Sequence, residues 1–288
     1  MRANACLFVK IELRQIVKQC AIKQDEVDMA RTILVTSGKG GVGKTTVCAG
    51  LGAALARMGQ SVCLIDFDFG LNNLDLMLNI EDRVIYDANA VMAGRCKLKQ
   101  ALVADKTQNN LYFLATGRMT AAQIEGIGEI LEKLSGVFDF CIIDCAAGAG
   151  ESFKAGLSAC SEVLIVTNPS ISSLRDAVKL RGLIAGEKAE LIGCVVNRIR
   201  GDLVAAGKMI NENQIEEQTG IKVRGVIPES DDILVYSNTC AISECGVAFS
   251  YFEKLASANL KNRNFRIDYV SKYRGVFGAI KSVLKRNA

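Results

Sequence analysis

The chain passes from an apolar run through a glycine-rich loop into a helical pattern between residues 32 and 58. Residues 32–37 are β-branched and apolar, as in a buried strand. The loop, residues 38–45, reads Gly-Lys-Gly-Gly-Val-Gly-Lys-Thr. An apolar stripe with the spacing of one helix face follows it: Leu51, Ala54, Leu55 and Met58. A strand, a glycine loop and a helix in this order predict an α/β fold with a phosphate-binding loop.

The chemistry of this loop suits a nucleoside triphosphate. Glycines allow consecutive backbone N–H groups to converge on phosphate oxygens, at the positive end of the helix that follows. Lys44 is expected to reach the β- and γ-phosphates, and the Thr45 hydroxyl to ligate Mg²⁺. The expected nucleotide-binding residues of the loop are Gly40, Gly41, Val42, Gly43, Lys44, Thr45 and Thr46.

Six further apolar runs alternate with helical patterns, at residues 62–65, 111–114, 140–143, 163–166, 191–196 and 223–227. Runs that are almost wholly apolar are typical of parallel strands covered on both faces. The sequence therefore predicts a doubly wound, mostly parallel α/β sheet, in one P-loop domain that spans residues 29–265. No window of the sequence approaches the apolar length needed to span a bilayer.

Three aspartates follow two of these runs, where ligands of such sheets bind. Asp66 and Asp144 are expected, with Thr45, to organise Mg²⁺. Asp68 is expected to orient the attacking water, which makes it a catalytic candidate together with Lys44. The alternative for any single aspartate is a cap on the next helix.

The chain has eleven cysteines, no histidine and no C-x-x-C pair. Cys63, Cys141 and Cys194 lie in predicted buried strands. Without a secretory signal, this pattern favours reduced core cysteines over disulfides or a zinc site.

Lys39 adds a second lysine to the loop. Residues 39–46, Lys-Gly-Gly-Val-Gly-Lys-Thr-Thr, resemble the deviant Walker A motif of the MinD/ParA ATPases. In that family the signature lysine reaches across a homodimer to the partner's nucleotide. The resemblance implies a catalytic role for Lys39 and an ATP-bound homodimer, with ATP and Mg²⁺ as cofactors. The alternative is a solvated charge at the mouth of the loop.

Further blocks resemble the MinD branch of the family, the division-site-selecting ATPases: residues 66–75, 83–87, 94–102, 167–176 and 225–229. The resemblance implies that Asn197 recognises adenine and that Pro228 packs on the base or ribose. It also implies slow ATP hydrolysis stimulated by a MinE-like or other partner, and recruitment of a MinC-like septum inhibitor. One block departs: the branch typically has Asp-x-Pro-Ala-Gly-Ile-Glu, whereas residues 144–150 read Asp-Cys-Ala-Ala-Gly-Ala-Gly. This change puts the hydrolysis rate and the partner response in question.

From Tyr269 onward, apolar residues recur every three or four positions among basic ones. This predicts a basic amphipathic tail, residues 266–288, on an anionic membrane surface. The expected membrane contacts are Tyr273, Val276, Phe277, Ile280, Lys281, Val283, Leu284 and Lys285. Two tails of an ATP-bound dimer would bind the membrane more firmly than a single tail does. This implies a cytoplasmic protein that is peripheral on the inner face of the cell membrane. The alternative is a terminal helix docked on the core.

Residues 1–28 form a mixed apolar and basic stretch ahead of the first core strand. Residues 29–32, Met-Ala-Arg-Thr, resemble a natural beginning, so this stretch is predicted to be an extension from a mis-assigned start codon; the alternative is a functional arm. The net charge of +4, with basic residues gathered at the two ends, gives no expectation of nucleic-acid binding. Three alternative functions are a flagellar-placement ATPase of the FlhG type, a nucleotide-gated scaffold with little hydrolysis and an iron–sulfur carrier of the same fold.

Overall fold

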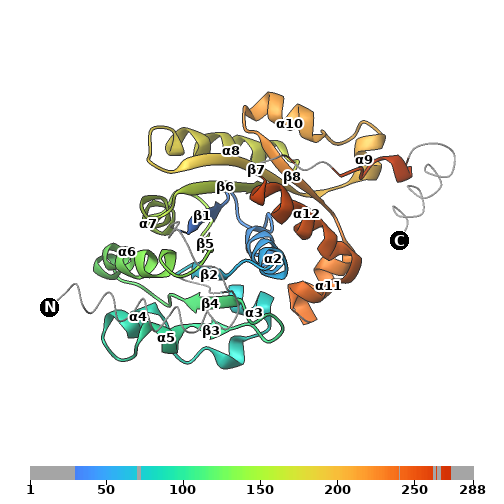
Figure 1. Ribbon diagram of the computed structural model, residues 1–288. Helices are drawn as coiled ribbons and strands as arrows, with labels where there is room; N and C mark the ends of the chain where they lie inside the picture. Colours follow the sequence, from blue (N-terminus) through green and yellow to red (C-terminus); the bar gives the residue numbers. More distant parts are fainter. Residues whose placement is uncertain (1–29, 70–72, 240, 262–263, 265–266, 274–288) are drawn as a thin grey trace.

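The computed structural model describes residues 30–69, 73–239, 241–261, 264 and 267–273. Within these residues, eight strands form one sheet in the order β3-β4-β2-β5-β1-β6-β7-β8 (Figure 1). The strands are β1 Arg31–Thr36, β2 Val62–Phe67, β3 Val103–Ala104, β4 Leu111–Ala115, β5 Phe140–Cys145, β6 Glu162–Thr167, β7 Glu190–Ile199 and β8 Val223–Pro228. The two-residue β3 pairs antiparallel with β4, and the other pairings are parallel. The predicted doubly wound, mostly parallel sheet is confirmed.

Helices cover both faces of the sheet, with α6, α7 and α8 on one side and α2, α11 and α12 on the other (Figure 1). The described α-helices are α2 Lys44–Arg57, α3 Leu74–Leu78, α4 Ala88–Met92, α5 Leu98–Ala101, α6 Ala121–Ser135, α7 Glu151–Ala159, α8 Ile171–Ile184, α9 Gly201–Ala205, α10 Glu212–Thr219, α11 Asp231–Thr239 and α12 Phe249–Leu260. Short 3-10 turns lie at Glu81–Arg83, Ile242–Glu244, Gly246–Ala248 and Ser271–Tyr273. Among the described helices, none combines the length and apolarity that a bilayer crossing requires.

Each strand contributes to two cores because successive side chains point to opposite faces of the sheet. In β1, Leu34 packs in the cluster under α6, α7 and α8, whereas Ile33 and Val35 pack in the cluster under α2 and α12. Cys63, Cys141 and Cys194 are buried free thiols in the strands, as the sequence predicts. The near-continuous apolar runs are therefore explained by burial on both faces.

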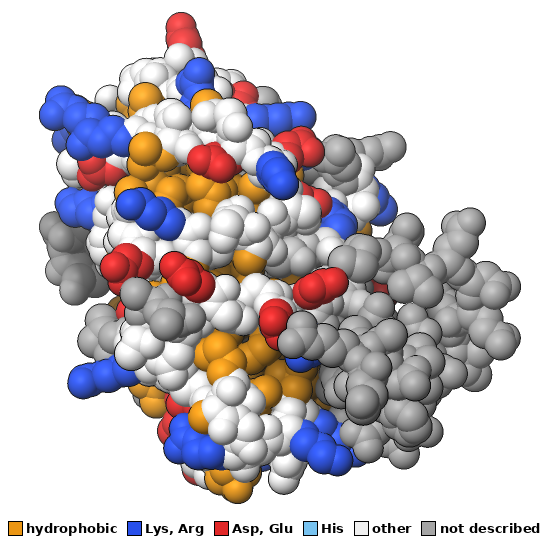
Figure 2. Space-filling model, turned by 90° about the vertical axis from the view of Figure 1, so that its left-hand side faces the viewer, with side chains coloured by type: hydrophobic (Ala, Val, Ile, Leu, Met, Phe, Trp, Pro, Cys, Tyr) orange, Lys and Arg blue, Asp and Glu red, His pale blue; other side chains and the backbone are white. Residues whose placement is uncertain are grey.

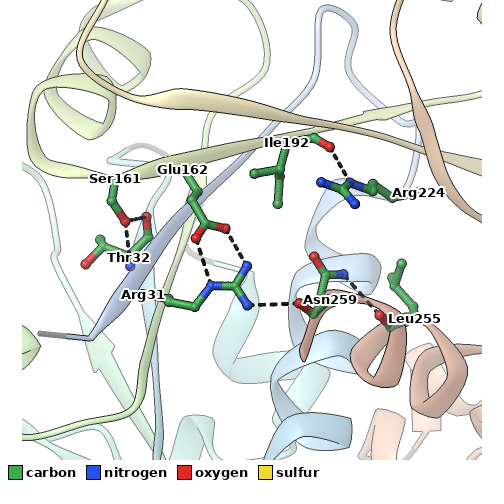
Figure 3. A network of polar contacts seen from close by, with 8 residues as sticks. All are labelled: Arg31, Thr32, Ser161, Glu162, Ile192, Arg224, Leu255 and Asn259. Atoms are coloured by element: carbon green, nitrogen blue, oxygen red, sulfur yellow. Dashed lines mark hydrogen bonds and ion pairs between the residues drawn. The ribbon is translucent and has the colours of Figure 1, made fainter. Parts of the chain in front are cut away.

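A polar network joins the amino end of β1 to its surroundings (Figure 3). The Arg31 guanidinium donates to both carboxylate oxygens of Glu162 on β6, at 2.7 and 2.6 Å, and to the backbone carbonyl of Asn259 on α12, at 2.9 Å. These bonds fix the end of β1 that lies opposite the glycine loop. Because α12 also packs along α2, the network helps to hold α2 against the sheet.

The segment Ile267–Tyr273 belongs to the body of the protein. Tyr269 is 4% exposed, and its hydroxyl donates a hydrogen bond to Glu212 at the start of α10. Its backbone carbonyl lies so close to Gly201 that a side chain at residue 201 would clash with it. The expectation that Tyr269 begins the exposed apolar face of the tail was wrong, because this ring is part of the core. The remaining tail residues 274–288, like residues 1–28, lie outside the described residues.

Candidate functional site

The glycine loop joins β1 to α2 at the carboxyl edge of the sheet, in a shape that depends on its glycines. Gly41 and Gly43 have φ values of 77° and 86°, in the left-handed region that favours glycine. A Cβ atom at Gly38 would lie 2.5 Å from Asp176 Cβ. Gly43 is also the N-cap of α2, so the loop delivers its N–H groups to the positive end of a 14-residue helix. This is a phosphate-binding geometry.

Lys44 and Asp144 form a buried ion pair at the centre of the site, with 2.5 Å between the lysine Nζ and a carboxylate oxygen. Their side chains are 9% and 2% exposed. Burial acts to lower the pKa of Lys44, but the neighbouring carboxylate of Asp144 outweighs it, and the net shift is upward. The Thr45 side chain acts to lower the pKa of Asp144, against the rise that burial causes. Lys44 therefore stays positively charged at the first residue of α2.

Asp66 lies directly beside Asp144, because β2 and β5 are neighbours and the two residues are register partners. Asp66 accepts hydrogen bonds from the backbone N–H groups of Asp68, at 2.9 Å, and Leu74, at 3.1 Å. Burial, and then the charge of Asp144, raise the pKa of Asp66 to about 7. Two buried carboxylates therefore lie side by side, an arrangement that a cation would stabilise.

The donor set at this edge fits Mg²⁺. Thr45, Asp66 and Asp144 offer oxygen atoms, the ligand type that Mg²⁺ prefers. Among the described residues, no group of three or more His, Cys, Asp and Glu side chains could hold a metal by itself. Mg²⁺ usually takes one or two protein carboxylates together with nucleotide phosphates and waters.

Lys39 lies apart from this buried group. Its side chain is exposed, and its ammonium is 3.4 Å from the Ser172 hydroxyl in the first turn of α8. The Ser37 hydroxyl donates to the Lys39 carbonyl at 3.0 Å, which fixes the backbone beneath it. The two lysines of the loop are therefore in different environments. Ser172 lies within residues 167–176, which resemble the MinD branch, but the sequence alone gave this serine no role.

Asn197 and Pro228 lie together, as their predicted common role requires. With Thr46 they line one small cavity of about 40 Å³ beside the loop. Asn197 is 6% exposed, and its Nδ2 donates to the Val42 carbonyl at 2.8 Å. The parallel pairing of β7 with β8 brings the two residues to the same edge. The two residues therefore lie side by side next to the phosphate loop.

The segment that departs from the typical MinD pattern remains attached to the loop. The Gly148 N–H donates to the Ser37 carbonyl at 2.8 Å, and Gly148 has a φ of 90°. Glu151, one residue beyond the position where the pattern has glutamate, is exposed and begins α7.

Cys48 received no individual role from the sequence alone. It is buried on α2, near Asp144 and Lys44, and burial, followed by the charge of Asp144, raises the pKa of its thiol. Its position one helical turn after Lys44 is the signal that could have found it.

Comparison with known proteins agrees with this geometry. A family model described as "CobQ/CobB/MinD/ParA nucleotide binding domain" matches residues 33–238. The septum site-determining protein MinD of Bacillus subtilis is 42% identical over 215 residues, covering 73% of this chain and 80% of that protein. MinD of Synechocystis is also 42% identical, over 213 residues, with the same two shares of coverage.

Solved structures show the same relationship. The chain from the MinC:MinD cell division protein complex of Aquifex aeolicus superposes with a TM-score of 0.75 and 34% identity, covering 83% of this chain and 98% of that one. MinD of Pyrococcus horikoshii complexed with Mg-ADP gives a TM-score of 0.71 and 30% identity, covering 80% and 96%. Family model, sequence relatives and structures agree over most of the chain, which therefore belongs to the MinD/ParA family of nucleotide-binding proteins, in its MinD group.

Proposed function

We propose that this protein is an ATP-dependent, dimerising ATPase of the inner membrane face, which helps to select the division site by recruiting a MinC-like septum inhibitor. The proposal is supported by its membership of the MinD group and by the MinC:MinD complex of a relative. A homodimer forms when ATP is bound, and hydrolysis is slow until a MinE-like or other partner stimulates it.

The ion pair of Lys44 with Asp144 suggests how the site changes when a nucleotide binds. A triphosphate in the loop competes with Asp144 for the lysine ammonium. Lys44 then turns to the phosphates, which leaves the Asp144 carboxylate free to accept a hydrogen bond from a water molecule. When bound, Mg²⁺ compensates phosphate charge, held by Thr45 with Asp66 and Asp144 close by. Asp68, whose charge is felt at Asp144, orients the attacking water.

The observation that best supports the proposal is that the two loop lysines lie in different environments. Lys44 is buried against Asp144, whereas Lys39 is exposed and contacts the first turn of α8. A long cation at the mouth of the site is available to a second subunit. Two subunits would then close over their nucleotides, with each Lys39 completing the other site.

Lys39→Ala tests this role. We expect the variant to bind ATP but to remain monomeric by light scattering in ATP and Mg²⁺, because the body of the site is intact. Lys179→Ala is the matched control, since Lys179 is another exposed lysine, paired with Asp176 on α8. If Lys39→Ala dimerises as the wild type does, Lys39 is a solvated surface charge and the proposed exchange is wrong.

Membrane attachment is tested by sedimentation with anionic vesicles in ATP and in ADP. The truncated chain must end after Tyr273, because Tyr269 is in the core and its loss would disturb folding. We expect pelleting to require ATP and to be lost in this truncation and in Phe277→Glu, but kept in Ser282→Glu, which adds the same charge at a polar position. Pelleting in both nucleotides would contradict the switch. Phosphate release in the same samples separates an ATPase from the nucleotide-gated scaffold.

A further inference from the structure

A cavity of about 720 Å³ lies between α6 and α7, on the side of the molecule opposite α2 and α12. Ile127 and Leu131 of α6 and Ala155 of α7 contribute apolar lining, and Glu125 and Glu132 are exposed beside them. Figure 2 faces this side of the molecule and shows hydrophobic side chains in its hollows, with acidic side chains next to them. The α6–α7 groove is therefore apolar inside and acidic at its edge.

The chain enters the described structure at this groove. Ala30 lines the cavity, and its N–H donates to the carbonyl of Ser135, the last residue of α6, at 2.9 Å. The 29 residues before Ala30 are thus tethered to the foot of the groove. At the other end of the described chain, the 3-10 turn Ser271–Tyr273 contacts α9, which lies away from α6 and α7 (Figure 1).

The tethered segment carries a pattern suited to packing between helices. Apolar residues recur at alternating spacings of three and four, the repeat of a helix that packs along another helix: Cys6, Val9, Leu13, Ile16 and Cys20. In helical form, residues 6–20 would span about 22 Å, the length of the 15-residue α6. Residues 21–29 can reach about 30 Å, so either orientation along the groove is possible.

Charge favours the same pairing. Residues 1–24 hold five basic residues and a single acidic one, Glu12. The groove is lined by Glu125, Glu132 and Glu151, with Lys154 as its basic member.

We propose that residues 6–20 form an amphipathic helix that occupies the α6–α7 groove of the same chain. Residues 1–28 are then a functional arm that covers the α6–α7 groove and bears on α7, the helix that follows the altered residues 144–150. The tether gives the helix an effective concentration on the order of 1 mM, so that even a weak affinity of about 0.1 mM leaves about nine-tenths of the molecules docked.

The first experiment substitutes residues of the proposed helix and measures the response of α6, in nucleotide-free, full-length protein. Leu13→Asp places a charge in the apolar seam, and Gln15→Asp places the same charge on the outer side of the helix. We expect hydrogen exchange of the α6 amides to rise several-fold in Leu13→Asp and to stay unchanged in Gln15→Asp. The body is untouched by either substitution, so a folding failure does not confuse the result.

The reciprocal variant is Gly128→Arg, which puts bulk and positive charge into the groove. A Cβ at the exposed Gly128 meets nothing within 4 Å, and the same is true of the control Gly182→Arg on α8. With about nine-tenths of the segments docked in the wild type, we expect brief trypsin treatment to cleave after Arg14 about tenfold faster in Gly128→Arg and at the wild-type rate in Gly182→Arg.

Unchanged α6 exchange in Leu13→Asp, or equal cleavage in the two glycine variants, would overturn the proposal. Protection of α6 that grows with protein concentration would also overturn it, because the occupant would then be the arm of a second copy.

Discussion

Replacing the loop glycines one at a time by alanine should separate backbone strain from steric conflict. Gly40 lacks a positive φ, and a Cβ atom there would meet nothing within 4 Å. Gly41 has a positive φ and the same open space. Gly43 has a positive φ, and a Cβ atom there would also clash with Asn197 Nδ2. Gly40→Ala should therefore be neutral or stabilise the nucleotide-free protein by about 0.4–1 kcal/mol, through the unfolded chain. Gly41→Ala should cost about 1–2 kcal/mol, the penalty of a left-handed non-glycine residue.

Gly43→Ala should cost most. To the left-handed penalty it adds the displacement of Asn197, whose bond to the Val42 carbonyl is worth about 1 kcal/mol, so the sum is roughly 2–3 kcal/mol. In a domain of this size that lowers Tm by about 4–10 °C. The assay is thermal and urea unfolding without nucleotide. Equal losses at the three positions, or the largest loss at Gly40, would refute the reasoning, because neither φ nor the Asn197 contact would then control the cost.

Two further outcomes follow from the buried charges. The pKa of Asp66 is about 7 in the folded protein and near 3.8 when unfolded, so the folded state holds an extra proton between these values; stability of the nucleotide-free protein should fall by up to about 4 kcal/mol as pH rises from 4 to 7. Urea titrations in Asp66→Asn should show a smaller fall, because burial also raises the pKa of Asp144, and an unchanged pH profile would contradict the assignment. Lys44→Met leaves Asp144 buried without its cation and should cost about 3–5 kcal/mol at neutral pH. Lys179→Met removes an exposed ion pair and should cost less than about 1 kcal/mol, so similar losses in the two variants would count against a buried pair.

Much of the fold could be read from local pattern. The apolar runs became β1, β2 and β4 to β8, because strands buried on both faces must be apolar almost throughout. The glycine loop was equally readable, since positive φ angles and close backbone approach leave little choice but glycine.

Tyr269 shows where local pattern fails. Its spacing fits the apolar face of the predicted tail, yet its ring packs in the body and its hydroxyl bonds Glu212, 57 residues earlier in the chain. A residue with an apolar body and a polar tip suits a membrane surface and a half-polar core equally well. The choice depends on whether a distant partner is present, which spacing does not encode.

The sequence by itself determined that this chain builds a parallel α/β sheet with a phosphate loop, because strand, glycine and helix signals are local and follow from backbone sterics. The tertiary structure alone decided which residues surround the loop and how far each of them is buried. The order of the strands sets Asp66 beside Asp144 and Asn197 beside Pro228, buries Lys44 in an ion pair and leaves Lys39 exposed. These relations arise between residues far apart in the chain, and charge and burial, which set each pKa and each partner, exist only once the sheet has brought those residues together.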